Sequence, residues 1–165
     1  MKTRLTFLIA AIALMATSFG CKKTNCCVLP EETNAIIALK GSDEWRTTGY
    51  LFKYNTRTDT VAVVGSKGRD NLTITIKKSG NKYVMIEATF YDLTGDIINA
   101  DYALDTSKTN SFETTTSTSE LLEGKFNLYF KLVHGDSTYP KTVVFKNGLF
   151  RIRWDNLPPP GSLGG

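Results

Sequence analysis

Hydrophobic and polar residues alternate along most of the chain from Ala35 onward. In the run Leu72–Ile76 apolar residues at every second position are separated by threonine, and Phe126–Leu132 has the same two-residue period. Because successive side chains of a β-strand point to opposite faces, this period predicts half-buried strands. Thr, Val, Ile, Tyr and Phe predominate in these runs, and these residue types favour strands. No segment after residue 20 has a convincing helical period, so we predict an all-β fold.

Turn-forming residues divide the chain into short predicted strands. Signals such as Ser66–Gly68, Ser79–Asn81 and Leu93–Asp96 separate the alternating runs. The predicted strands are Ala35–Leu39, Thr47–Tyr54, Thr60–Val64, Asn71–Lys77, Lys82–Tyr91, Ile98–Leu104, Ser111–Thr115, Gly124–Val133, Lys141–Phe145 and Leu149–Trp154. Short connections favour pairing of sequential strands. We therefore predict an antiparallel meander of about 9–10 strands that closes as a small, lipocalin-like barrel or folds as a sandwich, because either arrangement protects the sheet edges.

The dipeptide Asn147-Gly148 is typical of a two-residue type I′ hairpin turn. With that loop length Phe145 faces Phe150 and Val143 faces Ile152, so apolar residues gather on one face of the hairpin. Register and burial agree, and we predict a hairpin at this point.

The alternation also predicts which side chains share one interior. These are Leu72, Ile74, Ile76, Val84, Ile86, Phe90, Phe126, Leu128, Phe130, Val143, Phe145, Phe150, Ile152 and Trp154. Tyr50, Phe52 and Tyr54 form a further aromatic stripe at strand spacing, preceded by Trp45. Such a stripe can stack on sugars, but large apolar side chains are more often buried, and we expect this stripe in the core.

The first 20 residues have the features of a secretory signal peptide. Lys2 and Arg4 precede an uncharged, mostly apolar run, Leu5–Ala16, which is too short to span a bilayer. Ser18–Cys21 resembles a bacterial lipobox, although Ser18 stands where Leu is usual. We predict that Cys21 is lipidated after cleavage; the alternative is ordinary secretion with Cys21 as a free thiol. Acyl chains hold a protein on a bilayer through many buried methylene groups.

Cys26 and Cys27 are the only other cysteines. Adjacent Cα atoms lie about 3.8 Å apart, closer than the 4.4–6.8 Å or so that a disulfide prefers. Free thiols in a tether, an intermolecular disulfide and half of a shared metal site remain open, and we favour the first. No His or Cys elsewhere has zinc-site spacing, so we predict no metal site.

These features divide the chain into a signal peptide (1–20), a lipidated tether (21–34), an all-β domain (35–156) and a flexible C-terminal tail (157–165). The tail, LPPPGSLGG, is unsuited to a central strand. Residues 113–120, ETTTSTSE, are low in complexity and are predicted to form a loop. The domain contains no cysteine, so its hydrophobic core must stabilise it without disulfides.

Charge is modest and dispersed. Loss of Lys2 and Arg4 with the signal peptide would lower the formal net charge from +4 to +2. No basic block is present, which argues against nucleic acid as a partner. Lys22 and Lys23 follow the predicted lipid site, where surface-exposed lipoproteins of Bacteroidetes often carry acidic residues. We therefore predict an outer-membrane lipoprotein that faces the periplasm rather than the cell surface.

The order of features resembles a family of small Bacteroidetes lipoproteins. The features are an apolar strand and Gly41 followed by Trp45, then Glu123–Phe126 opening a long strand, then Lys146–Phe150 near the end. The resemblance covers about residues 34–154. It implies an all-β domain of unknown function and supplies no activity or catalytic residues.

No catalytic motif is recognisable in the sequence. His134 is the only histidine and lies in a turn-like segment beside Asp136 and Ser137, which lacks the convergent geometry of a triad. Asp92 and Asp96 flank a glycine but supply too few ligands for a calcium loop. There is no Walker loop or dinucleotide fingerprint, and we predict no cofactor. A carboxylate pair for glycoside hydrolysis remains open, because any two of 16 acidic residues could converge.

We therefore expect a lipid-anchored, non-enzymatic β domain of the cell envelope that binds a small apolar ligand, a glycan or an envelope protein. The alternatives are a glycan-active enzyme with a carboxylate pair and an assembly subunit that recognises another envelope protein through an edge strand. Asp59–Val61 and Asp136–Thr138 also resemble the O-glycosylation motif of Bacteroidetes, which makes Thr60 and Ser137 candidate acceptors.

Overall fold

The computed structural model describes residues 34–54 and 59–156. The predicted signal peptide, Cys21, Cys26, Cys27 and the C-terminal tail lie outside these residues. The strands are β1 (Ala35–Lys40), β2 (Asp43–Lys53), β3 (Thr60–Lys67), β4 (Asp70–Ser79), β5 (Lys82–Thr94), β6 (Ile97–Leu104), β7 (Ser111–Ser117), β8 (Leu121–His134) and β9 (Thr142–Arg153). The described part of the chain contains no helix with the length and hydropathy of a membrane span.

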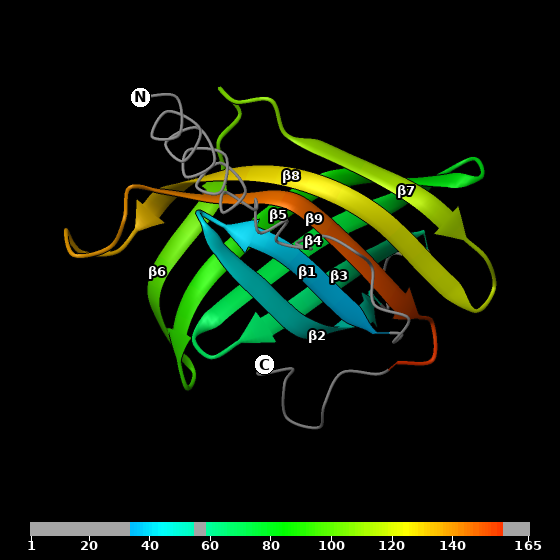
Figure 1. Ribbon diagram of the computed structural model, residues 1–165, viewed down its shortest axis with the longest axis horizontal. Helices are drawn as coiled ribbons and strands as arrows, with labels where there is room; N and C mark the ends of the chain where they lie inside the picture. The colour runs from blue at the N-terminus through cyan, green and yellow to red at the C-terminus, as the bar shows by residue number, and fades with distance from the viewer. Residues whose placement is uncertain (1–33, 55–58, 157–165) are drawn as a thin grey trace, which may run out of the picture.

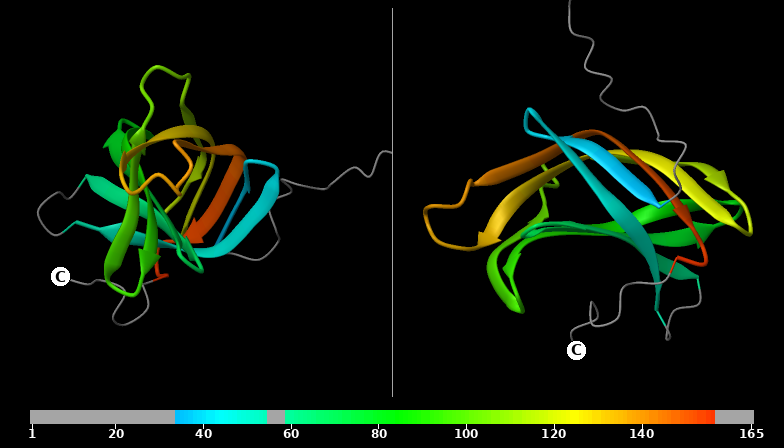
Figure 2. Two further views of the ribbon diagram at one scale, coloured as in Figure 1. Left: turned by 90° about the vertical axis from the view of Figure 1, so that its left-hand side faces the viewer. Right: turned by 60° about the horizontal axis from the view of Figure 1, so that its bottom comes forward.

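All nine strands belong to one antiparallel sheet with the order β6-β5-β4-β3-β2-β1-β9-β8-β7. β6 also pairs with β8, which closes a ring of hydrogen bonds through eight of the strands (Figures 1 and 2). The predicted all-β antiparallel meander is therefore confirmed, and it closes as one sheet rather than as two packed sheets.

One edge of β8 is shared by two strands. β6 pairs with the segment Phe130–His134, and β7 pairs with Leu122–Asn127 (Figure 1). The side chain of Asn110 bridges the gap between them, because its Oδ1 accepts a hydrogen bond from the Tyr129 amide at 2.8 Å. The ladder along β8 is thus continued by a side chain where the chain passes from β6 to β7.

The interior is filled by side chains from the inward-facing positions of all nine strands. Phe90, Phe130 and Phe145 pack against one another with ring centroids 5.3–6.1 Å apart, and Trp45 packs edge-on against Phe145. The predicted core is confirmed for Leu72, Ile74, Ile76, Phe90, Phe126, Leu128, Phe130, Val143, Phe145, Phe150 and Ile152, all of which are buried. Trp154 is half-buried and packs against the end of this core.

The predicted hairpin at Asn147-Gly148 is wrong. Lys141–Phe145 and Leu149–Trp154 do not form two strands, because β9 runs continuously between β1 and β8. A β-bulge interrupts both ladders here, and Asn147 adopts a left-handed φ of 51°. An extra residue in a strand shifts the alternation, so that residues on the two sides of the bulge at an odd spacing lie on the same face. A two-residue turn would also place Phe145 and Phe150 on one face, opposite each other. Phe145 and Phe150 therefore both point inward, which is why the burial pattern fitted the wrong topology.

Gly148 is required by a close approach of an aromatic ring. A Cβ atom at this position would lie 2.3 Å from the Phe126 ring, which crosses the strand directly over the glycine. Gly124 has the same relation to Phe150, because a Cβ atom there would lie only 2.5 Å from that ring. The two glycines allow two large aromatic side chains to fill the interior beside the bulge.

A second bulge corrects the prediction for Val84 and Ile86. β5 shifts register against β4 between the pairs Thr75–Glu87 and Ile76–Met85. The shift turns Tyr83 and Met85 toward the interior, and Val84 and Ile86 are 47% and 50% exposed. The sequence analysis assumed strict alternation from Phe90 back to Val84, and it therefore placed Val84 and Ile86 on the inward face when they lie on the outward face.

The low-complexity run 113–120 is not a loop throughout. β7 continues to Ser117, because its threonine-rich residues extend the ladder against β8. Only residues 118–120 connect β7 to β8. Threonine is β-branched and suits a strand, and this preference outweighs the low complexity of the run.

Candidate functional site

The closed sheet has two ends that differ in the side chains at their mouths. The Asp70 end carries the β1–β2, β3–β4 and β5–β6 turns and the β8–β9 loop. The Trp154 end carries the β4–β5 and β7–β8 turns, the start of β1 and the end of β9. At both ends the inward-facing rows of apolar residues finish in polar or aromatic side chains.

The Trp154 end contains a cleft of about 700 Å³, which we call the Trp154 cleft. It is lined by Lys53, Val61, Lys78, Asn81, Tyr83, Ser117, Thr118, Ser119 and Trp154. Three lining residues continue the inward-facing rows of their strands, because each stands two positions after a buried residue. They are Lys53 after Leu51, Lys78 after Ile76 and Trp154 after Ile152. The cleft is therefore the mouth of the sheet at this end, and its volume lies within the range of small-molecule sites.

Trp154 is held in place on several sides. Its indole Nε1 donates a hydrogen bond to the Thr118 carbonyl at 2.9 Å, and its amide donates to the Glu120 carbonyl at 3.0 Å. The Lys53 ammonium lies 5.3 Å from the indole centroid, within cation–π distance. These contacts fix the ring before any ligand arrives, so Trp154 forms a preorganised aromatic wall.

Tyr83 provides a second aromatic wall. Its ring centroid lies 5.8 Å from that of Trp154, with the two planes inclined by 44°. The Thr114 hydroxyl of β7 donates to the Tyr83 carbonyl at 2.9 Å and ties β7 to β5 at this point. Burial raises the pKa of Tyr83 above its ordinary value of 10.0. A tyrosine phenol is protonated at neutral pH even at its ordinary pKa, so Tyr83 can donate a hydrogen bond to a ligand.

The lining that the structure describes for the Trp154 cleft carries positive charge and no carboxylate. Lys53 and Lys78 form no ion pair with any described residue. Asp59 pairs with Lys77 at 3.3 Å, and Asp155 pairs with Arg153 at 3.0 Å. Asp59 and Asp155 are thus matched to cations other than the two cleft lysines, whereas Glu120 of the β7–β8 turn is exposed and forms no ion pair with a described residue.

The Asp70 end has the opposite character. Asp70 accepts hydrogen bonds from Lys40 at 2.6 Å and from the Trp45 indole at 3.1 Å. Lys40 in turn lies 4.8 Å from the centroid of the Phe90 ring. The inward-facing cation and anion at this mouth therefore neutralise each other above the aromatic core.

A second network adjoins the first. Asp92 accepts from Arg69 Nε at 2.8 Å and from Asn99 at 3.1 Å, and Arg69 also donates to the Tyr139 hydroxyl at 2.8 Å. Hydrogen bonding to Asp92 raises the pKa of Arg69. Burial, and then the charge of Asp92, raise the pKa of the nearby Tyr102. The Asp70 end is thus closed by paired charges.

Asp70 and Asp92 are also the pair of acids that bears on the hydrolase alternative. They are direct cross-strand neighbours on β4 and β5, and both lie on inward-facing rows. A glycosidase needs one carboxyl group free to act as an acid and another free to act as a nucleophile or base. Here each carboxylate is occupied by a cation and by a further N–H donor. The arrangement therefore favours a structural role for the pair.

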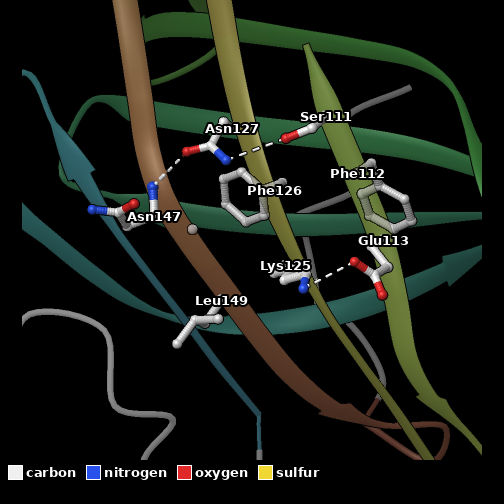
Figure 3. Close-up of a pocket in the computed structure, with 9 residues that line it drawn as sticks. Ser111, Phe112, Glu113, Lys125, Phe126, Asn127, Asn147 and Leu149 are labelled. Carbon is white, nitrogen blue, oxygen red and sulfur yellow. Dashed lines mark hydrogen bonds and ion pairs between the residues drawn. The ribbon is translucent and has the colours of Figure 1, made fainter.

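A second hollow, of about 480 Å³, lies along β7, β8 and β9 beside the Asn147 bulge (Figure 3). Its polar groups bind one another. Asn127 donates to Ser111 at 3.2 Å and accepts from the Asn147 amide at 2.8 Å, while Lys125 pairs with Glu113 at 2.9 Å. These contacts join three strands around the bulge and match the charges of the described lining, so the hollow is explained by the fold.

The candidate glycosylation sites differ in accessibility. Thr60 is 3% exposed, and its hydroxyl donates to Asp59 at 3.1 Å. Ser137 is exposed in the β8–β9 loop, where the Asp136 carboxylate accepts from the Thr138 amide at 2.8 Å. Of the two hydroxyls, only that of Ser137 is open to a modifying enzyme in the folded domain.

The other residues considered from sequence are dispersed. His134 is exposed at the end of β8, and Asp96 is exposed in the β5–β6 turn. Tyr50 and Phe52 are half-buried on the outward-facing row of β2, and Tyr54, just after β2, is half-buried too, so the expected place of this stripe in the core is wrong. The buried Leu51 lies between Tyr50 and Phe52, on the inward-facing row of β2 that also carries Trp45.

Sequence reasoning did not identify Lys53, Lys78 and Tyr83 as site residues, and it placed Trp154 only in the core. The sequence does contain a signal for these residues. If the two-residue spacing of the inward-facing apolar residues is continued past the last of them, it reaches the side chain that lies at the mouth. Ile74 and Ile76 lead to Lys78, just as Leu72 leads back to Asp70. Continuing this spacing to the strand ends would identify the side chains at both mouths, provided that the bulge in β5 is known.

Comparisons of the chain with family models, curated proteins and solved structures each found no match. Within residues 34–54 and 59–156, no group of three His, Cys, Asp or Glu side chains is arranged to hold a metal ion.

Proposed function

We propose that this chain is a non-enzymatic binding domain of the bacterial cell envelope that holds an anionic small ligand in the Trp154 cleft. The observation that carries the proposal is the cationic lining of the cleft beside a fixed aromatic wall. Two lysines without ionic partners among the described residues face the same space as Trp154 and Tyr83. A ligand with a negative group and a flat or ring-shaped body complements both features.

The lining also supplies directional contacts. Ser117, Thr118 and Ser119 follow one another in the β7–β8 turn, and Asn81 faces them from the β4–β5 turn. Hydroxyl and amide groups orient a ligand, and Val61 adds an apolar contact in the lining. This combination supports binding of a polar, anionic ligand and departs from the small apolar ligand expected from the sequence.

The location of the domain follows from the N-terminal sequence. We propose that Cys21 carries the lipid anchor and that the domain lies on the periplasmic side of the outer membrane, as in the small Bacteroidetes lipoproteins that the sequence resembles. Lys22 and Lys23 support this orientation because they stand where surface-exposed Bacteroidetes lipoproteins often carry acidic residues.

Titration calorimetry of the full chain tests the binding proposal with matched ligand pairs. Trigalacturonate and its methyl ester differ in charge, as do glycerol phosphate and glycerol. We expect the anionic member of at least one pair to bind and the neutral member not to bind. Lys53→Gln with Lys78→Gln should weaken binding by about tenfold or more, because a hydrogen bond to a charged group contributes about 1.5–3 kcal/mol.

The matched control removes two exposed lysines elsewhere, Lys141→Gln with Lys146→Gln, and so makes the same change in net charge. Binding that falls equally in both double variants would reflect overall charge and would contradict the cleft as the site. Binding that is unchanged by Trp154→Phe and by the cleft lysines would also place the ligand elsewhere.

Metabolic labelling with an alkyne fatty acid tests the anchor separately. The wild-type chain should be labelled and Cys21→Ser should not, because the thiol of Cys21 is the proposed acceptor. Equal labelling of the two proteins would remove the lipid anchor from the proposal.

A further inference from the structure

The Trp154 cleft lies at the end of the domain where the predicted tether joins it. Asn34, the first described residue, is fixed beside the end of β9: its amide donates to the Arg151 carbonyl at 2.6 Å and its Oδ1 accepts from the Arg153 amide at 2.9 Å. Its carbonyl also accepts from the Gly49 amide of β2 at 2.9 Å. Trp154 is the residue that follows Arg153, so the attachment point and the cleft wall are neighbours.

This attachment is rigid. Asn34 adopts a left-handed φ of 70°, a conformation that asparagine adopts more readily than most non-glycine residues. The hydrogen bonds with β2 and β9 hold Asn34 in place. Asn156 ties the residues after β9 to the same part of β2 by donating to the Gly49 carbonyl at 2.6 Å. The chain therefore enters the domain at a fixed position at the Trp154 end.

The distance from the lipid to this point is limited by covalent geometry. Residues 21–34 join Cys21 to the first strand, and a chain of this length spans at most about 50 Å even when fully extended. A lipid at Cys21 keeps the bilayer within that distance of the Trp154 end. The Asp70 end lies at the opposite end of the strands, further from the attachment point.

The chemistry of this end suits a membrane surface. Trp and Tyr prefer the interface between lipid and water, and Trp154 and Tyr83 are half-buried at the mouth. Lys53 and Lys78 line the cleft, and Lys82 is exposed beside it, whereas Lys77 is paired with Asp59. Lysines near an anionic leaflet are each worth about 1 kcal/mol of membrane attraction.

We propose that the Trp154 cleft faces the bilayer and binds the phosphate head group of an anionic phospholipid. The inference rests on the proposed function, because it takes the lipid anchor and the cationic cleft from there and adds the orientation and the ligand class. The phosphate is paired with Lys53 and Lys78, the hydroxyl and amide groups of the turns orient the glycerol, and the two aromatic rings lie at the level of the head groups.

Tryptophan fluorescence in the lipidated full chain tests the orientation. The chain has two tryptophans, one at each end of the sheet: Trp154 at the cleft and Trp45 beside Asp70. Vesicles of phosphatidylcholine and phosphatidylglycerol with brominated acyl chains quench an indole near the bilayer. We expect quenching in the wild type and its loss in Trp154→Phe, which retains Trp45. Quenching that persists in Trp154→Phe would place the other end at the membrane and overturn the inference.

Vesicle flotation of the Cys21→Ser chain tests the head group without the lipid anchor. It should bind phosphatidylcholine vesicles only when phosphatidylglycerol is present. Lys53→Gln with Lys78→Gln should lower the partition coefficient about 30-fold, equivalent to about 2 kcal/mol. The control Lys141→Gln with Lys146→Gln should change it about threefold or less.

The outcomes separate the two proposals. Equal partition of the cleft variant and the control variant would overturn the head-group assignment. Binding of trigalacturonate in the cleft without binding to anionic vesicles would also overturn it, and would leave the proposed function standing with an acidic glycan as the ligand. Failure of every anionic ligand to respond to the cleft lysines would contradict both.

Discussion

At both mouths of the sheet the inward-facing rows end in charged side chains, but these charges are paired at one mouth and lack carboxylate partners among the described residues at the other. At the Asp70 end the inward rows finish in Lys40, Asp70 and Asp92, and every one of these charges has a partner. At the Trp154 end they finish in Lys53, Lys78 and Trp154, and the two ammonium groups have no carboxylate partner among the described residues.

The difference shows where the fold is complete and where it is open to a ligand. A charge paired inside the protein lowers the cost of its desolvation and closes the end of the core. A cationic cleft with fixed aromatic walls stays hydrated in the free protein and gains its counter-charge from outside. We therefore assign stability to one end and binding to the other.

The largest expected effect tests which side chains point inward, because both mouths are defined by that direction. Phe130 is buried against Phe90 and Phe145, whereas the neighbouring Tyr129 is half-buried on the outer face. Phe130→Ala should lower the free energy of unfolding by about 3–5 kcal/mol, as truncation of a core aromatic does. Tyr129→Ala should cost much less. Urea melts of the full chain compare the two, and a greater loss for Tyr129→Ala would mean that the sheet is assigned inside out.

The next effect separates the two mouths directly. Asp70→Ala leaves Lys40 and the Trp45 indole without their acceptor, and should lower the free energy of unfolding by about 1–3 kcal/mol. Lys53→Gln with Lys78→Gln breaks no described ion pair and removes only the cation–π contact of Lys53 with Trp154, so it should change this free energy by about 1 kcal/mol or less. The same urea melts measure both. Similar losses for the two variants would erase the proposed division between a stabilising end and a binding end.

Acid should destabilise the domain through surface carboxylates other than Asp70 and Asp92. Hydrogen bonds hold the pKa values of five carboxyl groups below their ordinary values. These groups and their first partners are Asp59 with Lys77, Asp105 with Ser107, Glu113 with Lys125, Asp136 with Thr138 and Asp155 with Arg153.

Because the folded pKa of each group is the lower one, its contribution is present above the unfolded pKa and is lost as the pH falls through the folded value. Stability should therefore be level above about pH 5.5 and should fall below about pH 4.5. Melts as a function of pH measure this decline, and Lys77→Met should make it shallower by removing the partner of Asp59. A stability that rises on acidification would have the opposite sign and would contradict the account.

The smallest expected effect concerns the phenols of Tyr83, which is half-buried, and Tyr102, which is buried. Burial raises the pKa values of both Tyr83 and Tyr102, but the carboxylate of Asp92 contributes only at Tyr102. Asp92→Asn should therefore lower the pKa of Tyr102 and leave that of Tyr83 unchanged. NMR titration of ¹³Cζ-labelled tyrosine resolves the two. A shift of both phenols would show that the two ends are coupled rather than independent.

The sequence predicts the strands and most of the interior because alternation is a local property. It could not predict the bulges, since a one-residue insertion and a two-residue turn give Phe145 and Phe150 the same facing. Asn147-Gly148 suits a hairpin taken alone, and only the ladders to β1 and β8 on both sides hold β9 continuous. Likewise, the exposure of Val84 depends on a register shift that no local pattern records.

The candidate site was harder to predict for a related reason. Lys53, Lys78 and Tyr83 lie on three different strands, and closure of the sheet brings them to one mouth. Each alone is an ordinary strand-end residue. They form a candidate anion site only because the described lining of the cleft contains no carboxylate, and the folded structure is needed to see which side chains share that lining.

The most direct test of the central claim uses the two indole N–H groups as reporters of the two mouths. The Trp45 indole is bound to Asp70 and the Trp154 indole to the Thr118 carbonyl, so each gives its own signal in a ¹H–¹⁵N spectrum. Titration with short-chain phosphatidylglycerol below its micelle concentration should move the Trp154 signal and leave Trp45 in place, and short-chain phosphatidylcholine should move neither. Movement of the Trp45 signal alone, or equal movement with both lipids, would contradict the assignment of anion binding to the Trp154 cleft.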